Sequence, residues 1–164
     1  MLRLTLVRHA TAEPARNEQE DWDRALEAQG QRDAREMGQR LKSRRLKPNS
    51  ILSSPAVRAQ ATATIMAREL GVAAAQVRYD ERLYLASAKN LLQVIQELGG
   101  QTKHLMVVGH NPGITEFADE VSGDRSVDNL PTCAVYTLQF DTKYWSELEW
   151  ASGLNADFDY PKKA

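Results

Sequence analysis

The chain has 164 residues, 42% of them hydrophobic, and a formal net charge of -1 at pH 7. A chain of this length buries roughly 70% of its unfolded surface, enough for a core without disulfides or metals, so we expect one domain over residues 1–164. The near-zero charge argues against a nucleic-acid binder that works by counterion release, and no run approaches the ~18 apolar residues of a membrane span.

The chain also carries signs of its cellular compartment. Its single cysteine, Cys133, excludes an intrachain disulfide and fits a reducing environment. The first expected strand starts at Leu2, which leaves no room for a signal peptide. We therefore expect a cytoplasmic protein that does not bind membranes.

Short apolar runs alternate with amphipathic segments along the chain, which is typical of a largely parallel sheet covered by helices. Strands are expected over 3–8, 50–53, 76–79, 104–108, 133–140 and 144–151, the last two joined by a hairpin at 141–143. Helices are expected over 29–43, from Pro55 to Gly71, from Ser87 to Gly99, and from Pro112 through Val121, and the tail 153–164 is expected to be irregular. The fold class is thus α/β, a three-layer α/β/α arrangement with a mostly parallel central sheet and an antiparallel edge.

The spacing of apolar residues predicts which face of each helix is buried. The expected inner faces are Ala34, Met37 and Leu41; Val57, Ala61 and Ile65; Leu91, Ile95 and Leu98; and Ile114, Phe117, Ala118 and Val121.

Two histidines follow expected strands directly, His9 after the first and His110 after the fourth. In open α/β sheets, ligands bind at the carboxyl ends of the strands. Arg8 precedes one of these histidines, and Arg58 lies in the first turn of the helix after strand 50–53, where the helix N-terminus adds partial positive charge. Guanidinium groups bind phosphate bidentately, so the pattern predicts an anion cradle with a histidine on two sides.

Three motifs in this order resemble a known family. They are Arg8-His-Ala-Thr11, Ser53-Ser-Pro-Ala-Val-Arg58-Ala, and Gly109-His-Asn-Pro-Gly113. They resemble the histidine phosphatase (phosphoglycerate mutase-like) superfamily, and within it the small SixA-type phosphohistidine phosphatases, from Leu4 to about Lys162. The resemblance implies a phosphoglycerate mutase-like fold and a phosphatase.

The chemistry of these residues suggests the same division of labour that the resemblance implies. His9 is the candidate nucleophile, kept neutral by the nearby arginines, and it forms a phosphohistidine intermediate. His110 donates to the phosphoryl oxygens together with Arg8 and Arg58. These cations do the neutralising that Mg²⁺ does elsewhere, so we expect neither a metal nor another cofactor.

Several further residues are weaker candidates. Glu81 is the expected general acid, in a motif resembling Glu-Arg-x-Tyr, with Asp80 as its rival and a solvated turn carboxylate as the plain alternative. Thr11, Ser53 and Asn111 are expected to orient phosphate or the imidazoles, although packing explains each as well. His104, at the start of a strand, is expected to be structural, and Thr132 and Cys133 are expected to approach the site.

Other chemistries fit the sequence poorly. A cysteine phosphatase needs an arginine six residues after Cys133, and position 139 is Gln. No Gly-x-x-x-x-Gly-Lys occurs, and the three histidines lack zinc-site spacing. The acidic stretch 13–27 is interpreted as a solvated segment, or else as a surface for a basic patch on a protein partner.

Three functions stay open at this point. The chain is a phosphatase of phosphohistidine in a protein such as a phosphotransfer domain, a phosphatase or mutase of small phosphate esters, or a phosphate-binding module without turnover. The nucleophile argues against the third. The short connectors 79–87 and 122–132 predict an open pocket, which suits hydrolysis of a phosphate presented on a macromolecule.

Overall fold

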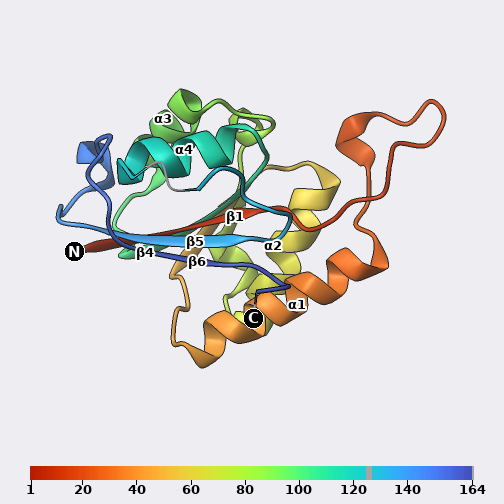
Figure 1. Ribbon diagram of the computed structural model, residues 1–164, viewed down its shortest axis with the longest axis horizontal. Coiled ribbons are helices and arrows are strands. Elements are labelled where there is room, and N and C mark those ends of the chain that lie inside the picture. The colour runs from red at the N-terminus through yellow and green to blue at the C-terminus, as the bar shows by residue number, and fades with distance from the viewer. Residues whose placement is uncertain (125–126, 164) are drawn as a thin grey trace.

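Six strands form one mixed sheet in the order β3-β2-β4-β1-β5-β6 in the computed structural model, which describes residues 1–124 and 127–163 (Figure 1). The strands are β1 (Leu2–Arg8), β2 (Ser50–Ser53), β3 (Val77–Tyr79), β4 (His104–Gly109), β5 (Val135–Phe140) and β6 (Leu154–Asp159). The first four pair in parallel, whereas β5 runs antiparallel to β1, and β6 runs antiparallel to β5. The predicted parallel sheet with antiparallel pairing at one side is confirmed.

Two pairs of helices cover the two faces of this sheet (Figure 1). The helices are α1 (Ala28–Ser43), α2 (Val57–Leu70), α3 (Ala88–Leu98) and α4 (Gly113–Ser122), with short 3-10 turns η1 (Asp21–Asp23), η2 (Ala74–Gln76), η3 (Glu81–Leu83) and η4 (Trp145–Glu147). Residues alternate between the faces along each strand. Leu4 and Leu6 of β1 therefore pack in the core under α3 and α4, while Val7 packs in the core under α1 and α2. The α/β/α layering is confirmed.

The helix ends follow the predicted signals. Gly71 ends α2 with a φ of 74°, the left-handed conformation that glycine adopts without strain. The Ser87 hydroxyl accepts a hydrogen bond from the Asn90 N–H and so caps α3. The buried faces of α1 and α4, and Leu91 and Ile95 of α3, are also as predicted.

The prediction for the inner face of α2 was displaced by about one residue. Val57, Ala61 and Ile65 are only partly buried, and the fully buried positions of the helix include Arg58, Ala59, Thr62, Ala63 and Met66. The displacement is caused by a polar residue, because Thr62 is turned inward, where its hydroxyl accepts a hydrogen bond from the Ala10 N–H. A pattern that counts only apolar residues does not register such a position.

The C-terminal part of the chain differs most from the prediction. Residues 144–151 are not a strand, because Trp145 is buried and its indole N–H donates to the Thr102 carbonyl, which ties this segment over the end of α3 as a 3-10 turn. The expected irregular tail instead supplies strand β6. Its aspartates disfavour a strand by propensity, but at the sheet edge Asp159 pairs with Arg40 of α1 and Asp157 pairs with Arg44, which directly follows α1.

The strand expected from Cys133 begins two residues later, at Val135. Cys133 has a φ of 61°, and its N–H lies 3.0 Å from the Arg8 carbonyl and 3.1 Å from the His9 carbonyl. This turn fixes the backbone just after β1. The expected loop 122–132 includes residues 125 and 126, which lie outside the described residues.

The carboxyl ends of β1 and β4 lie side by side, with Arg8 opposite Gly109 in the parallel register. The residues that follow, His9 and His110, therefore start from neighbouring points of the same sheet edge. Within residues 1–124 and 127–163, no helix is both long and apolar enough to cross a membrane.

Candidate active site

His9 is held by its backbone and by its ring at the end of β1. Its Nδ1 lies 2.8 Å from the Ala10 carbonyl oxygen. Because a carbonyl can only accept, Nδ1 carries the proton and Nε2 carries the lone pair. Burial lowers the pKa of His9 to about 4, the Ala10 hydrogen bond opposes this shift, and the charges of Arg58 and Arg8 add to it. At neutral pH the ring is thus an uncharged base with an unprotonated Nε2.

His110 lies beside His9, with ring centroids 5.1 Å apart. Its Nε2 is 2.8 Å from the Ser54 hydroxyl, and the Tyr84 ring packs edge-on against the imidazole at 5.4 Å. Its Nδ1 is buried and has no hydrogen-bond partner in the described part of the chain. Burial lowers the pKa of His110 to about 3, with His9 and Arg58 adding to the shift.

The two arginines bring positive charge to the same place. Arg58 comes from the first turn of α2, is 3% exposed, and donates from Nε to His9 Nε2 at 3.3 Å. Arg8 donates from Nη1 to the Leu130 carbonyl at 2.9 Å, while its Nε is buried and lacks a partner among the described residues. The predicted convergence of Arg8, His9, Arg58 and His110 is thus observed, and all four line one cleft.

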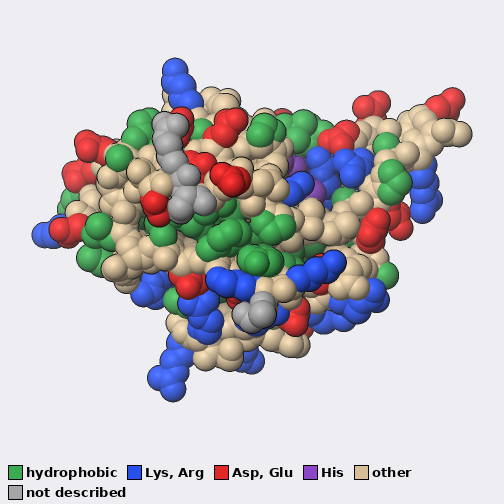
Figure 2. Space-filling model, in the orientation of Figure 1, with side chains coloured by type: hydrophobic (Ala, Val, Ile, Leu, Met, Phe, Trp, Pro, Cys, Tyr) green, Lys and Arg blue, Asp and Glu red, His purple; other side chains and the backbone are tan. Residues whose placement is uncertain are grey.

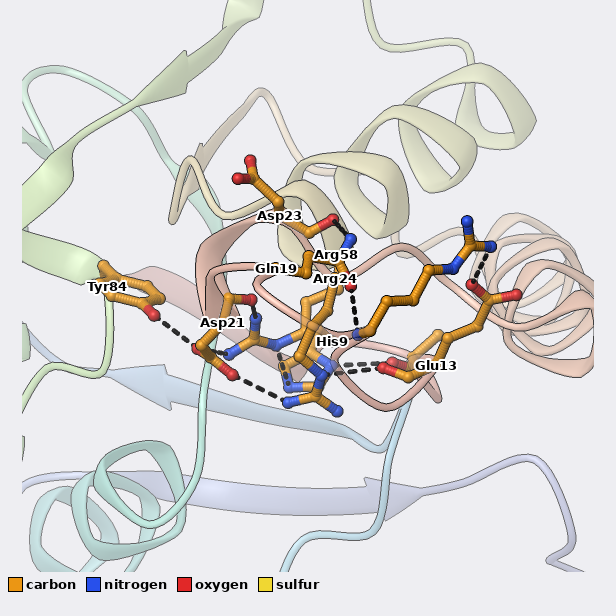
Figure 3. A network of polar contacts seen from close by, with 10 residues as sticks. His9, Glu13, Gln19, Asp21, Asp23, Arg24, Arg58 and Tyr84 are labelled. Carbon is orange, nitrogen blue, oxygen red and sulfur yellow. Dashed lines mark hydrogen bonds and ion pairs between the residues drawn. The ribbon is translucent and has the colours of Figure 1, made fainter.

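Asp21 also lines this cleft, although no sequence motif points to it. Its carboxylate accepts from Arg24 at 2.9 Å, from Arg58 Nη2 at 2.9 Å and from the Tyr84 hydroxyl at 2.5 Å (Figure 3). The hydrogen bond from Tyr84, with those from Arg24 and Arg58, holds the pKa of Asp21 well below its usual range. Since Asp21 stands among several other acidic residues of stretch 13–27, no spacing pattern distinguishes it from solvated neighbours.

The cleft has a volume of about 380 Å³. Its lining comprises Arg8, His9, Thr11, Ala12, Asp21, Arg24, Arg58, Leu85, His110, Asn111 and Thr132. Figure 2 shows a histidine surface among Lys and Arg side chains in a hollow between the body and the projecting segment after β1. In the described ranges, no group of three or more His, Cys, Asp or Glu side chains could hold a metal ion.

Thr11 and Asn111 line the cleft, but both side chains already have partners. The Thr11 hydroxyl is 2.8 Å from that of Thr132, which does approach the site as expected. The Asn111 amide donates to Asn129 at 2.8 Å and accepts from Thr115 at 2.6 Å. These bonds order the turn before α4.

Ser53 and Ser54 face different surroundings. The Ser53 hydroxyl is buried and donates to the Ser54 carbonyl at 2.8 Å, and Ser53 is not among the described residues that line the cleft. It is Ser54 that contacts His110. Successive residues of a strand point to opposite faces, so an error of one position at a strand end exchanges the two serines.

Glu81 does not lie in the cleft. Its side chain is exposed in turn η3, and it is absent from the described lining. Its expected rival, Asp80, caps the same turn through the Arg82 N–H and pairs with the Arg82 guanidinium. The geometry therefore does not support the prediction of Glu81 as general acid, because capping by Asp80 leaves Glu81 on the solvent side.

Comparisons with known proteins agree with this geometry. Residues 4–84 match the model of the histidine phosphatase superfamily (branch 1). A crystal structure from Agrobacterium tumefaciens, assigned as phosphohistidine phosphatase SixA, is 28% identical with a TM-score of 0.78, covering 85% of this chain and 92% of that one. An uncharacterised Arabidopsis thaliana protein described as chloroplastic is 32% identical over 159 residues, 92% of this chain and 72% of its own length.

A more distant neighbour shares the fold. A mycobacterial glucosyl-3-phosphoglycerate phosphatase is 16% identical with a TM-score of 0.71, covering 98% of each chain. The predicted phosphoglycerate mutase-like architecture is thereby confirmed.

Proposed function

Because the chain belongs to the histidine phosphatase superfamily and is a phosphatase of the SixA type, we propose that it removes phosphate from phosphohistidine in a protein. The reaction passes through a phosphohistidine intermediate on His9. A phosphotransfer domain of a signalling relay is the kind of substrate that we propose.

In the first step, the lone pair on His9 Nε2 attacks phosphorus. A P–N bond forms to His9 as the P–N bond of the substrate breaks. A substrate imidazole that is protonated on its other ring nitrogen departs as neutral imidazole, so the proton that it needs is already present. In the second step, water attacks phosphorus, the bond to His9 breaks, inorganic phosphate leaves, and the remaining proton passes to phosphate or solvent.

The cations stabilise the charge on the phosphoryl oxygens in both steps. Arg58 lies against the attacking nitrogen, and Arg8 holds an Nε donor that has no other partner in the described part of the chain. We assign the same task to His110 through Nδ1, since its Nε2 is engaged with Ser54. Such donors are preorganised by burial, which makes them effective in the transition state.

The choice of substrate rests on the ionisation of Asp21, the carboxylate that lines the cleft. Asp21 accepts hydrogen bonds from Arg24, Arg58 and Tyr84, so it is ionised and has no proton to give. Glu81 lies outside the cleft. An alkyl phosphate ester needs a proton on its leaving oxygen, whereas protonated phosphohistidine does not. The site therefore suits phosphohistidine better than an alkyl ester.

The test compares hydrolysis of a phosphorylated histidine phosphotransfer domain with hydrolysis of a panel of phosphosugars. We expect kcat/KM for the phosphoprotein to exceed that for every sugar phosphate by about a hundredfold or more, the size of a typical general-acid contribution. A preference for any sugar phosphate would overturn the proposal and favour a phosphatase of small phosphate esters.

Two further parts of the proposal concern conditions. We propose that turnover needs no metal, so that activity in the presence of a chelator such as EDTA equals activity without it; loss of activity would contradict this.

The buried thiol of Cys133 is unpaired, which suits the reducing cytoplasm that we propose as the location of the protein.

A further inference from the structure

The carboxylate of Asp21 occupies the arginine that the proposed function uses to bind phosphate. Arg58 Nη2 donates to Asp21 Oδ2 at 2.9 Å, and Nη1 donates to the Asp21 carbonyl at 2.8 Å. The Arg58 side chain is 3% exposed, so little solvent reaches its other edge. Each terminal nitrogen of the guanidinium group therefore has an acceptor from this one residue.

A phosphoryl group ready for attack needs the same place. Its phosphorus must come within roughly 3–3.5 Å of His9 Nε2, and Arg58 Nε lies 3.3 Å from that nitrogen. The phosphoryl oxygens then adjoin the Arg58 guanidinium and, with it, the Asp21 carboxylate. Two anions beside one buried guanidinium repel each other, so Asp21 and phosphate compete for Arg58.

Asp21 is carried by a segment that is closed on itself. We call residues 12–26 the flap; its base is an antiparallel bridge between Ala12 and Leu26. Arg24 Nε donates to the Glu13 carbonyl at 2.8 Å across the flap. The flap projects from the body in Figure 1, and apart from Asp21 it meets the cleft wall where Trp22 packs on Tyr84 at 4.7 Å. The internal bonds of the flap therefore hold Asp21 in place independently of its contact with Arg58.

We propose that Asp21 is a positioning residue that holds Arg58 in the free enzyme in the place of a phosphate, and that the phosphoryl group of the substrate displaces it. The return of the carboxylate to Arg58 then favours release of inorganic phosphate. This inference rests on the proposed function only in taking Arg58 as a phosphate ligand.

The experiment measures binding of inorganic phosphate to the full chain by isothermal titration calorimetry. Asp21→Asn keeps the shape of the side chain and removes its charge, so we expect phosphate to bind about tenfold more tightly, the factor that corresponds to about 1.4 kcal/mol of relieved repulsion. Product inhibition by phosphate should strengthen by the same factor during turnover. A residue that only stabilised the fold would not tighten phosphate binding when it is replaced.

Asp23→Asn is the matched control. Asp23 belongs to the same 3-10 turn and is exposed, and its carboxylate points away from Arg58 (Figure 3). This variant changes the net charge equally, so phosphate affinity should stay within about twofold of wild type, because an exposed charge is screened. Equal tightening by both variants would show an effect of flap charge alone and overturn the proposal.

Unchanged or weaker phosphate binding by Asp21→Asn also overturns the proposal, because Asp21 would then orient Arg58 for phosphate instead of competing with it. Thermal denaturation checks the fold, and Asp21→Ser replaces the variant if the asparagine form does not fold, with the same expected outcomes. Calorimetry needs no turnover. A failure to hydrolyse phosphohistidine would therefore refute the proposed function, while the measured phosphate affinities would still test the role of Asp21.

Discussion

Strand β4 carries a buried histidine at each end, His104 at its start and His110 just after its last residue. The two rings share a low pKa, about 4 and about 3, and burial is the main cause for both. They differ in their hydrogen bonds. His104 binds the Thr5 hydroxyl at 2.7 Å and the Lys47 backbone, whereas His110 keeps Nδ1 without a partner in the described part of the chain.

Burial and a low pKa thus do not by themselves distinguish a reactive histidine from a structural one. The distinguishing features are unused hydrogen-bonding capacity and a shared cleft. His9 shares the cleft with His110, and its Nε2 accepts only the long hydrogen bond of 3.3 Å from Arg58 Nε.

The largest expected effect is on catalysis, and it separates the histidines of the cleft from His104. His9→Ala should lower kcat for phosphohistidine hydrolysis by roughly 10³-fold or more, because it removes the nitrogen that we propose as the nucleophile. His104→Gln should leave kcat within about threefold of wild type, since His104 lies at the opposite edge of the sheet. Steady-state kinetics of both variants on one substrate test the pair, and an active His9→Ala enzyme would refute the assignment of the nucleophile.

Replacing His110 sharpens the comparison within β4. His110→Gln should lower kcat by about 10²- to 10³-fold, the usual effect of losing one donor to a transition-state oxyanion. KM should change much less, because this donation strengthens mainly as charge develops. An equal loss in KM with unchanged kcat would instead assign His110 to ground-state binding.

The pH dependence of stability tests the buried, neutral ring of His104. Its pKa is 6.5 when unfolded and about 4 when folded, so the unfolded chain binds more protons in this window and stability falls as pH decreases from 6.5 towards 4. The shift corresponds to about 3 kcal/mol at ~1.4 kcal/mol per pKa unit. Urea titrations at pH 7 and pH 4.5 should show a smaller loss of unfolding free energy in His104→Gln than in wild type; equal losses would contradict the buried neutral ring.

The low pKa values of the cleft histidines predict that activity changes little in mildly acidic solution. Because the pKa of His9 is about 4, the ring of this proposed nucleophile stays neutral down to acidic pH, and kcat/KM should vary by less than about threefold between pH 7 and pH 5.5. Measurement on a phosphoprotein substrate, with the protonation of the substrate measured separately, checks this expectation. A tenfold loss by pH 5.5 would mean an ordinary, solvated imidazole.

The smallest effect is expected for the exposed carboxylate. Glu81→Gln should change kcat for phosphohistidine by less than about threefold, because its side chain lies outside the cleft. Asp80→Asn serves as the comparison, since it loosens turn η3 without touching the cleft. A large loss in Glu81→Gln alone would restore its predicted role as general acid.

The sequence predicted those parts of the molecule in which local pattern and global fold agree. Arg8, His9, Arg58 and His110 each end a strand, follow one or open a helix, so parallel topology alone brings them to one edge. Asp21 could not be found in this way, because its contact with Arg58 joins an irregular acidic segment to a distant helix. Strand β6 was missed for a related reason: Asp157 and Asp159 disfavour strands locally and are compensated by ion pairs with arginines at the C-terminal end of α1 and directly after it.

The central claim is that Nε2 of His9 takes up the phosphoryl group, and it is tested most directly by trapping the intermediate. The enzyme is mixed with a phosphorylated phosphotransfer domain, and the reaction is quenched in alkali, which preserves phosphohistidine. The position of the phosphate on the enzyme is then mapped by mass spectrometry and NMR. We predict phosphate on His9, attached at Nε2, and none in the His9→Ala variant. Phosphate on Nδ1, or on another residue of the enzyme, would contradict it.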